Sequence, residues 1–440
     1  MPNEAIKTTC CIVGGGPAGM MLGYLLARAG VDVTVLEKHK DFFRDFRGDT
    51  VHPSTLQVIY ELGLLDEFLK LPHQQLTRLG GVLGGYSFEA ADFRRLPTRC
   101  KFVALMPQWD FLDFFAEKAG QFPNFKLRME HEAVDLLEYE GRVVGVQATQ
   151  PGWPIDIHAD LVVGCDGRHS TTRNSAHFEV IESGVPIDVL WFRIGRSGND
   201  PEQLLGNFNY GSALILIPRG DYFQAGLLIR KGSFEQIQGA GIPAFREHVG
   251  RIAPHLRDLL DQITDWEQIK LLSIQINRLK RWHRPGLLCI GDAAHAMSPA
   301  GGVGINLAIQ DAVATANLLT NPLLHGEVTE ADLWRVQLRR EFPTRVTQAV
   351  QAFAHNQMAK LFENQGPARA PWQLKAVFQM PGVSRTIARA VGMGARPEHI
   401  GVAQPPCSGV SMKKVAIGVG LLAAGSILAM RWFTRARRTA

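Results

Sequence analysis

The feature that most constrains the fold is a glycine-rich turn near the start of the chain. Residues 8–13 form a short apolar run typical of a buried strand, and Gly14–Gly19 follow it with the spacing GxGxxG. Residues 17–29 then carry helix-forming side chains and end at Gly30, and residues 31–36 form a second, β-branched run. Proline near the start and glycine after the end are the usual limits of a helix. The sequence therefore predicts a βαβ unit within an α/β fold.

The composition of this turn favours a dinucleotide site. Gly14 makes the tight turn, Gly16 lets the backbone approach a pyrophosphate, and Gly19 lets helix and strand pack closely. The N–H groups at the start of the helix offer partial positive charge to the phosphates. Glu37 ends the second strand, 23 positions after Gly14, where an acid can bind ribose hydroxyls. The motif alone does not distinguish NAD from FAD.

Two later segments each place an acid just after an apolar strand. Asp166 follows the run at 162–165, and Asp292 follows the run at 288–291. A glycine-rich turn at 301–304 then opens a helix, whose N-terminus can stabilise negative charge on a bound ring system. His295 near Asp292 raises the idea of a metal or a catalytic dyad, but the glycine-rich context explains both residues without one.

With these three motifs in this order, residues 8–320 resemble the class A FAD-dependent monooxygenases of the para-hydroxybenzoate hydroxylase type. The resemblance implies that NAD(P)H reduces the flavin and that reduced flavin traps O2 as a C4a-hydroperoxide. One oxygen atom then passes to an aromatic or conjugated small-molecule substrate. No second GxGxxG unit appears, which fits a class that lacks a separate domain for NAD(P)H. Neither the residues nor the resemblance singles out a catalytic base or a metal ligand.

The resemblance also implies FAD contacts along the chain. These are the pyrophosphate cradle of Gly14, Gly16 and Gly19, the ribose ligand Glu37, Arg47 near the pyrophosphate and the NAD(P)H path, Gln108 touching the FAD, Asp166 linked to both nucleotides, Asp292 at the ribityl chain, Pro299 on the substrate side of the flavin, and Gly302, Gly304 and Asn306 at the pyrimidine end of the isoalloxazine.

The predicted architecture is a Rossmann-like FAD-binding domain with an inserted, mainly antiparallel β-sheet substrate domain and C-terminal helices. The expected boundaries are 1–75, 106–182 and 265–320 for the FAD-binding domain, 76–105 and 183–264 for the substrate domain, 321–403 for a helical region, 404–412 for a linker, and 413–440 for a basic apolar tail. Within the helical region, the helical stretch at 330–363 is expected to be interrupted at Pro343.

The tail accounts for the positive net charge of the chain. Residues 413–440 hold six basic residues and no acid, and the rest of the chain has 41 basic against 42 acidic residues. A general nucleic-acid-binding surface is therefore not expected. Residues 415–430 form an uncharged, mostly apolar run of 16 residues, about 24 Å as a helix against the roughly 30 Å core of a bilayer.

Three interpretations of the tail stay open: a single-pass anchor, an interfacial helix, and a soluble helix packed on the core or on a partner. The arginines after the apolar run resist translocation. We expect a protein on the cytoplasmic side, associated with a membrane through residues 415–433. Membrane contact would favour a lipophilic substrate.

Two alternatives to the hydroxylase reading remain. One is an FAD-dependent oxidoreductase without oxygen insertion, of the polyprenyl reductase type. The other is a membrane-tethered flavin-binding protein with a partner-binding role.

Six cysteines in 440 residues are too few for a disulfide scaffold, and four of them, Cys10, Cys11, Cys165 and Cys289, lie in apolar runs, so we expect reduced core cysteines. The N-terminus also lacks the pattern of a secretory signal.

Overall fold

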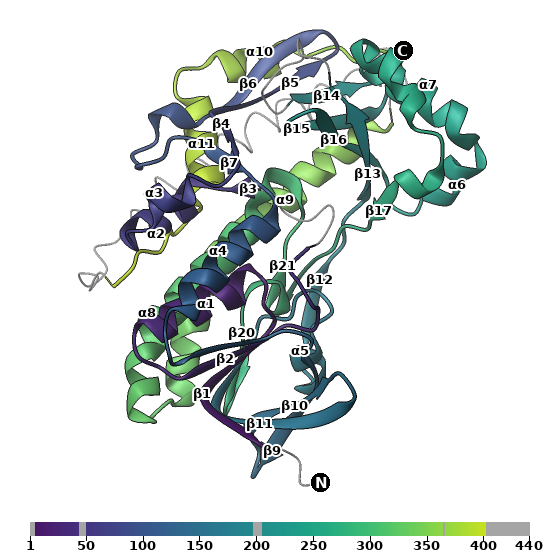
Figure 1. Ribbon diagram of the computed structural model, residues 1–440. Coiled ribbons are helices and arrows are strands. Elements are labelled where there is room, and N and C mark those ends of the chain that lie inside the picture. The colour runs from purple at the N-terminus through teal and green to yellow at the C-terminus, as the bar shows by residue number, and fades with distance from the viewer. Residues whose placement is uncertain (1–4, 44–49, 197–204, 364–365, 402–440) are drawn as a thin grey trace.

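The computed structural model describes residues 5–43, 50–196, 205–363 and 366–401 (Figure 1). Its largest sheet has the order β19-β20-β11-β1-β2-β8, and β10 and β9 extend it from β11. The pairs β1–β11, β1–β2, β2–β8 and β11–β20 are parallel. The strands are β1 (Ile6–Val13), β2 (Val33–Leu36), β8 (Phe125–Arg128), β9 (Glu132–Tyr139), β10 (Arg142–Gln150), β11 (Trp153–Gly164), β19 (His283–Arg284) and β20 (Leu287–Cys289).

Helices cover one face of this sheet. The helices α1 (Pro17–Arg28), α4 (Gln108–Gly120), α8 (Val303–His325) and α9 (Glu330–Leu361) run side by side there, with α1 in contact with both α4 and α8 (Figure 1). Every residue of α1 from Ala18 to Ala27 is buried. A helix that is apolar all round must be enclosed. The βαβ unit predicted from the glycine turn therefore forms the centre of the largest core.

A second, seven-stranded sheet lies at the other end of the molecule and is mainly antiparallel, as predicted. Its order is β17-β13-β16-β15-β14-β5-β6, and β14–β5 is a parallel pair. Alternate residues Leu190, Phe192 and Ile194 pack into a core with α7 and the neighbouring 3-10 helix. The elements are β5 (Arg78–Leu83), β6 (Tyr86–Asp92), β13 (Ile187–Gly195), β14 (Leu205–Asn209), β15 (Ser212–Arg219), β16 (Tyr222–Arg230), β17 (Lys270–Leu272), α6 (Phe234–Gly239), α7 (Gly241–Ile252) and the 3-10 helix Pro254–Gln262.

Shorter elements join the two sheets. Two three-stranded sheets have the orders β3-β7-β4 and β12-β18-β21. The bounds are β3 (Thr50–Val51), β4 (Gln74–Leu76), β7 (Val103–Leu105), β12 (Val180–Ser183), β18 (Ile276–Leu279), β21 (His295–Ala296), α2 (Pro53–Glu61), α3 (Leu65–Phe68), α5 (Thr171–Ser175), α10 (Trp372–Gln379) and α11 (Val383–Met393), with short 3-10 helices at Phe93–Arg95, Trp266–Gln268, Gly291–Ala293 and Ala300–Gly302.

The predicted interruption at Pro343 is wrong. The helix α9 runs through Pro343 as one element of 32 residues. Proline removes one backbone hydrogen bond from a helix, but tertiary packing can outweigh that local cost. Here Pro343 is buried and α9 packs against α8.

Five cysteines, including the four expected in the core, are buried and carry free thiols: Cys10, Cys11, Cys100, Cys165 and Cys289. Within the ranges that the structure describes, no helix has both the length and the apolarity needed to cross a bilayer. The predicted linker at 404–412 and the predicted tail at 413–440 lie outside those ranges.

Candidate functional site

The glycine turn is shaped to bring backbone close to a ligand. Gly14 has φ of 105°, and a Cβ there would lie 2.5 Å from the carbonyl oxygen of Cys165. A Cβ on Gly19 would overlap the carbonyl oxygen of Gly14, so neither position can carry a side chain. A Cβ on Gly16 would meet no atom within 4 Å. The turn therefore leaves open space at the N-terminus of α1, where a pyrophosphate fits.

Glu37 lies beside this turn. Its Oε2 accepts a hydrogen bond from the Gly15 N–H at 3.1 Å, and its Oε1 accepts one from the His39 N–H at 3.1 Å. The end of β2 thus brings a carboxylate to the glycine turn, as the spacing predicted. Binding of a ribose by Glu37 stays a prediction, as does binding of a pyrophosphate at the glycine turn.

Asp166 is bonded within the protein. Its Oδ1 accepts from Ser170 Oγ at 2.6 Å and from Thr172 Oγ1 at 2.9 Å, and its Oδ2 accepts from the Thr172 N–H at 2.9 Å. The carboxylate therefore stabilises the start of α5 and fixes the loop after β11. Contact of Asp166 with FAD and NAD(P)H stays a prediction.

Arg168 joins the two acidic motifs. Its Nε donates to Asp292 Oδ2 at 3.2 Å, and its Nη2 donates to the carbonyl oxygen of Met297 at 3.0 Å. The side chains of Arg168 and Asp292 are 27% and 34% exposed, so both can be reached by a ligand. Sequence reasoning missed Arg168, although its position directly after Asp166-Gly167 was the available signal.

Asn306 uses its whole amide inside the protein. Its Oδ1 accepts from the His52 N–H at 2.8 Å and from Thr55 Oγ1 at 2.7 Å. Its Nδ2 donates to the carbonyl oxygens of Thr50 at 3.2 Å and Gly302 at 3.1 Å. An amide has two donors and two acceptor lone pairs, so none is left for the flavin. Flavin contacts from this segment would therefore come from its main chain.

The other predicted contacts lie around the same segment. Gly302 has φ of 62° and approaches Thr50 too closely to carry a side chain. Pro299 and Gly304 flank it, just before and within the first turn of α8, and both are half-buried. Gln108 is the first residue of α4, shortly after β7, which pairs with the strand that contains Thr50. Arg47 lies outside the described residues.

Three buried side chains of α9 hold the loop that contains Pro299. Gln351 Oε1 accepts from the Ser298 N–H at 3.0 Å, and its Nε2 donates to the carbonyl oxygens of Ser298 and Ala300 at 2.9 and 3.0 Å. His355 Nε2 lies 2.9 Å from Ser298 Oγ. Gln348 Nε2 donates to the carbonyl oxygens of Asn277 at 2.7 Å and of Ala296, just before the loop, at 3.3 Å. The sequence shows that these three residues lie at helical spacing, on one side of a helix. It does not show that this side contacts the loop that contains Ser298.

Two histidines of this region make stability depend on pH. Burial lowers the pKa of His52 and of His355 to about 4, below the roughly 6.5 of an unfolded chain. The unfolded state therefore binds more protons between pH 6.5 and 4, and stability falls as the pH is lowered through that window. We expect each histidine to lower the free energy of unfolding by about 2 kcal/mol when the pH is lowered from 7 to 5.

Urea unfolding at the two pH values measures this loss. A His355→Gln variant should show a smaller drop than the wild type, because one of the two titrating groups is gone. An equal drop in both proteins would contradict the assignment to His355.

A buried ionic network connects the segment that follows Asp292 to α8 and α9. His295 Nε2 lies 2.5 Å from Asp311 Oδ2, and Arg340 Nε donates to Asp311 Oδ1 at 2.8 Å. Arg340 Nη1 also donates to Glu398 Oε1 at 3.1 Å. These four side chains are at most 1% exposed. His295 is thus a partner of α8, which answers the early idea of a dyad with Asp292.

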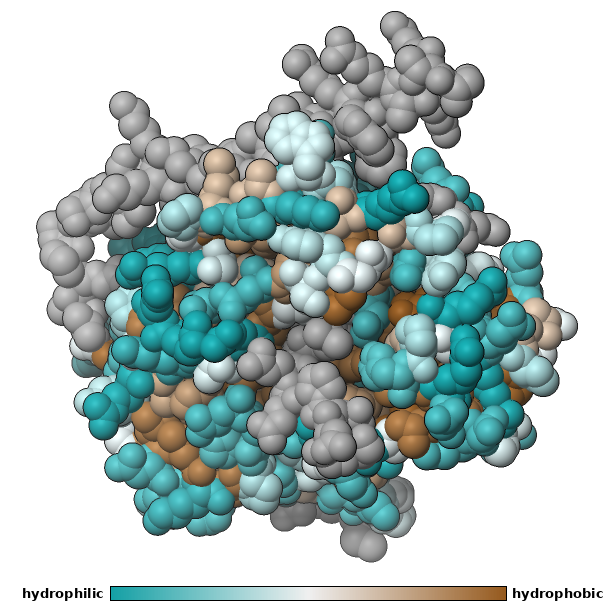
Figure 2. Space-filling model, turned by 90° about the horizontal axis from the view of Figure 1, so that it is seen from above, coloured by the Kyte–Doolittle hydropathy of each residue, from teal (hydrophilic) through white to brown (hydrophobic). Residues whose placement is uncertain are grey.

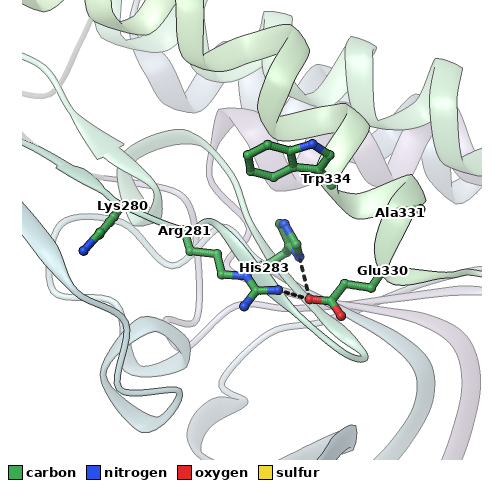
Figure 3. A pocket seen from close by; sticks show the side chains of 6 residues that line it. All are labelled: Lys280, Arg281, His283, Glu330, Ala331 and Trp334. Atoms are coloured by element: carbon green, nitrogen blue, oxygen red, sulfur yellow. Dashed lines mark hydrogen bonds and ion pairs between the residues drawn. The ribbon is translucent and has the colours of Figure 1, made fainter.

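A cavity in the described part of the chain is separate from this site. It has a volume of about 520 Å³ and lies where β19 meets the start of α9 (Figure 3). Glu330 forms an ion pair there with Arg281, and one of its carboxylate oxygens lies 3.7 Å from His283 Nδ1. The carboxylate of Glu330 is therefore already engaged by neighbours within the cavity. The predicted FAD contacts that the structure describes are not among its lining residues, which are Lys280, Arg281, His283, Glu330, Ala331 and Trp334.

Comparison with known families decides the cofactor. The model of the FAD binding domain family matches residues 7–350. The chain belongs to this family. The glycine cradle fits that cofactor, because the space in front of Gly16 takes a pyrophosphate. The resemblance to FAD-dependent monooxygenases is confirmed by relatives in sequence and structure.

Among curated relatives, 6-methylpretetramide 4-monooxygenase of Streptomyces rimosus is 30% identical over 376 residues, which cover 81% of this chain and 86% of the relative. Rifampicin monooxygenase of Streptomyces venezuelae is 28% identical over 68% of this chain and 61% of the relative. The chain thus spans most of the first relative but under two thirds of the second.

Solved structures share the fold. A probable FAD-dependent monooxygenase from Pseudomonas aeruginosa, PqsL, has 21% identity and a TM-score of 0.70, covering 81% of this chain and 98% of its own. The anhydrotetracycline hydroxylase OxyS from Streptomyces rimosus has 21% identity and a TM-score of 0.71, covering 92% and 78%. Together with the family match, these relatives identify the chain as an FAD-dependent enzyme of the monooxygenase type.

Proposed function

We propose that this enzyme uses NAD(P)H and O2 to hydroxylate a fused-ring aromatic or conjugated small molecule. The main support is the conjunction of the glycine cradle with relatives named for hydroxylation or monooxygenation of multi-ring compounds, among them 6-methylpretetramide and anhydrotetracycline. The bound FAD would supply electron transfer and oxygen activation, chemistry that side chains lack.

The chain's own residues would bind and orient the cofactor. Gly14, Gly16 and Gly19 would admit the pyrophosphate, and Glu37 would accept hydrogen bonds from the ribose. Asp292, held by Arg168, would meet the ribityl chain. Pro299 would face the flavin from the substrate side, and Gln351 and His355 would keep its loop in place. The N-terminus of α8, with Gly302 and Gly304, would place partial positive charge near the pyrimidine end.

Arg47, Gln108, Asp166 and Asn306 complete the set that we propose around the cofactor. Among them, Asp166 and Asn306 would act chiefly by fixing backbone, since their polar atoms bond to neighbouring residues. We also propose the domain division predicted above. The sheet of β1, β2 and β11 would belong to the FAD-binding domain, and the sheet of β13–β16 would belong to the substrate domain.

We further propose that residues 413–440 attach the enzyme to the cytoplasmic side of a membrane, with contact through residues 415–433. The support is the sequence of the apolar run at 415–430, with basic residues on both sides and no acid. Membrane attachment would favour a lipophilic substrate.

The test is a visible spectrum of the full chain purified in mild detergent with FAD. We expect flavin bands that bleach when NADPH or NADH is added without oxygen. Admission of O2 with a polycyclic phenol should then give a product heavier by one oxygen atom. Bleaching without oxygen in any product would favour the reductase alternative, and a flavin that neither nucleotide reduces would favour a binding protein.

A further inference from the structure

The segment from Gly366 to Pro397 has an unusual charge balance. It contains five basic residues and no acid: Arg369, Lys375, Arg385, Arg389 and Arg396. Within the part of the chain that the structure describes, none of the five forms an ion pair with a carboxylate. Some exposed cations elsewhere are paired, as in Lys280–Glu179 and Arg335–Asp332, but the segment 366–397 has no carboxylate of its own. The segment therefore presents positive charge that the protein itself does not neutralise.

The same segment exposes large apolar side chains. Trp372, at the start of α10, is 71% exposed, the highest value among the large apolar residues of the described chain, and Met380, just after α10, is 54% exposed. Arg385 and Arg389 are exposed one turn apart on α11, so they lie on one face of that helix. We call the exposed residues Trp372, Met380, Arg385 and Arg389 the α10–α11 face.

This face is held rigidly on the second sheet. Phe378 of α10 stacks on Phe88 of β6 with ring centroids 4.7 Å apart, and Lys375 lies 5.1 Å from the Tyr86 ring centroid. The Ala368 N–H donates to Asn209 Oδ1 at 2.8 Å, just before α10. In Figure 1, α10 lies at the upper end of the molecule and α11 lies below it. The view onto that end shows hydrophilic side chains with small apolar patches between them (Figure 2).

We propose that the α10–α11 face docks on an anionic membrane surface. Tryptophan favours the interface between headgroups and acyl chains, and cations near it are attracted to anionic lipids. An exposed methionine gains from contact with acyl chains but has no role against nucleic-acid phosphates, so a bilayer fits better than RNA. Docking is independent of the tail and of the reaction. It would bring β6 and the sheet behind it to the bilayer.

Sedimentation of the full-length FAD-loaded protein with vesicles tests this. The vesicles are phosphatidylcholine with and without phosphatidylserine. One cation near an anionic bilayer contributes roughly fivefold to affinity. We expect Arg385→Gln/Arg389→Gln to weaken binding to phosphatidylserine vesicles roughly 30-fold. The control, Lys7→Gln/Lys126→Gln, removes two exposed cations on the sheet that contains β1, of which Lys126 is paired with Asp32 at 3.9 Å, and it should bind as the wild type does.

A second variant separates insertion from charge. Trp372→Ser should weaken binding to both kinds of vesicle roughly tenfold, with no change in the thermal unfolding midpoint. Wild-type affinity in both the double variant and Trp372→Ser would overturn the proposal and leave membrane contact to the tail alone. The proposal also fails if the arginine variant loses affinity for single-stranded RNA and keeps its affinity for vesicles.

Discussion

Replacing Arg340 by Gln should lower the free energy of unfolding by about 3–5 kcal/mol, because it takes one cation away from two buried carboxylates, Asp311 and Glu398. Arg340 is fully buried and bonds both Asp311 and Glu398. Urea unfolding at pH 7 with saturating FAD measures the effect. Arg335→Gln is a control on the same helix. Arg335 is 69% exposed and pairs with Asp332, so its loss should cost under about 1 kcal/mol. Equal losses in the two variants would refute the role of the buried network.

The same network predicts how the stability of the protein changes when the pH falls below 4. Burial alone would raise the pKa of Asp311, but the charges and hydrogen bonds of His295 and Arg340 lower it below its ordinary value. A carboxyl with a depressed pKa stabilises the fold above its unfolded pKa near 3.9, and that stabilisation is lost as pH falls through the folded value. Below pH 4 the wild type should therefore lose stability more steeply than Arg340→Gln.

Alanine at Gly16 should weaken FAD binding and leave the apoprotein stable, whereas alanine at Gly19 should destabilise the apoprotein. A Cβ at Gly16 has room in the protein but enters the space assigned to the pyrophosphate. We expect Gly16→Ala to unfold at the wild-type urea midpoint without cofactor and to bind FAD about 100-fold more weakly, a loss of about 2.7 kcal/mol. Gly19→Ala would overlap the Gly14 carbonyl oxygen, so it should be destabilised even without FAD.

Fluorescence titration of FAD and unfolding of the apoprotein separate the two effects. If Gly16→Ala bound FAD with wild-type affinity, the pyrophosphate would not lie in front of Gly16. If Gly19→Ala were as stable as the wild type, the close contact between α1 and the turn would be wrong.

Local chemistry made part of this fold predictable. The glycine turn, the helix after it and the strand that ends just before Glu37 each follow from spacing within a short window. The placement of Asp292 after a buried strand follows from the same kind of pattern. Such features depend on residues that are neighbours in sequence, so a pattern can reveal them.

The rest depends on contacts between distant residues. The bonds from Gln351 and His355 to Ser298 span more than fifty positions, and the bond from Arg340 to Glu398 spans 58. The amide of Asn306 is taken up by residues near position 50. Pro343 misled because propensity describes an isolated helix, whereas α9 is held by its buried face.

The position of Glu398 bears on what counts as one folding unit. The match to the family ends at residue 350, yet Arg339 and Arg340 both bond to the carboxylate of Glu398, at least 58 positions downstream. His399 and the N–H of Ile400 both bond to Glu61, near the other end of the chain. A ribosome that has released only the family segment has therefore made a chain in which Arg340 has Asp311 but lacks its second carboxylate, Glu398. We expect the core to close cooperatively only after residue 400 has emerged.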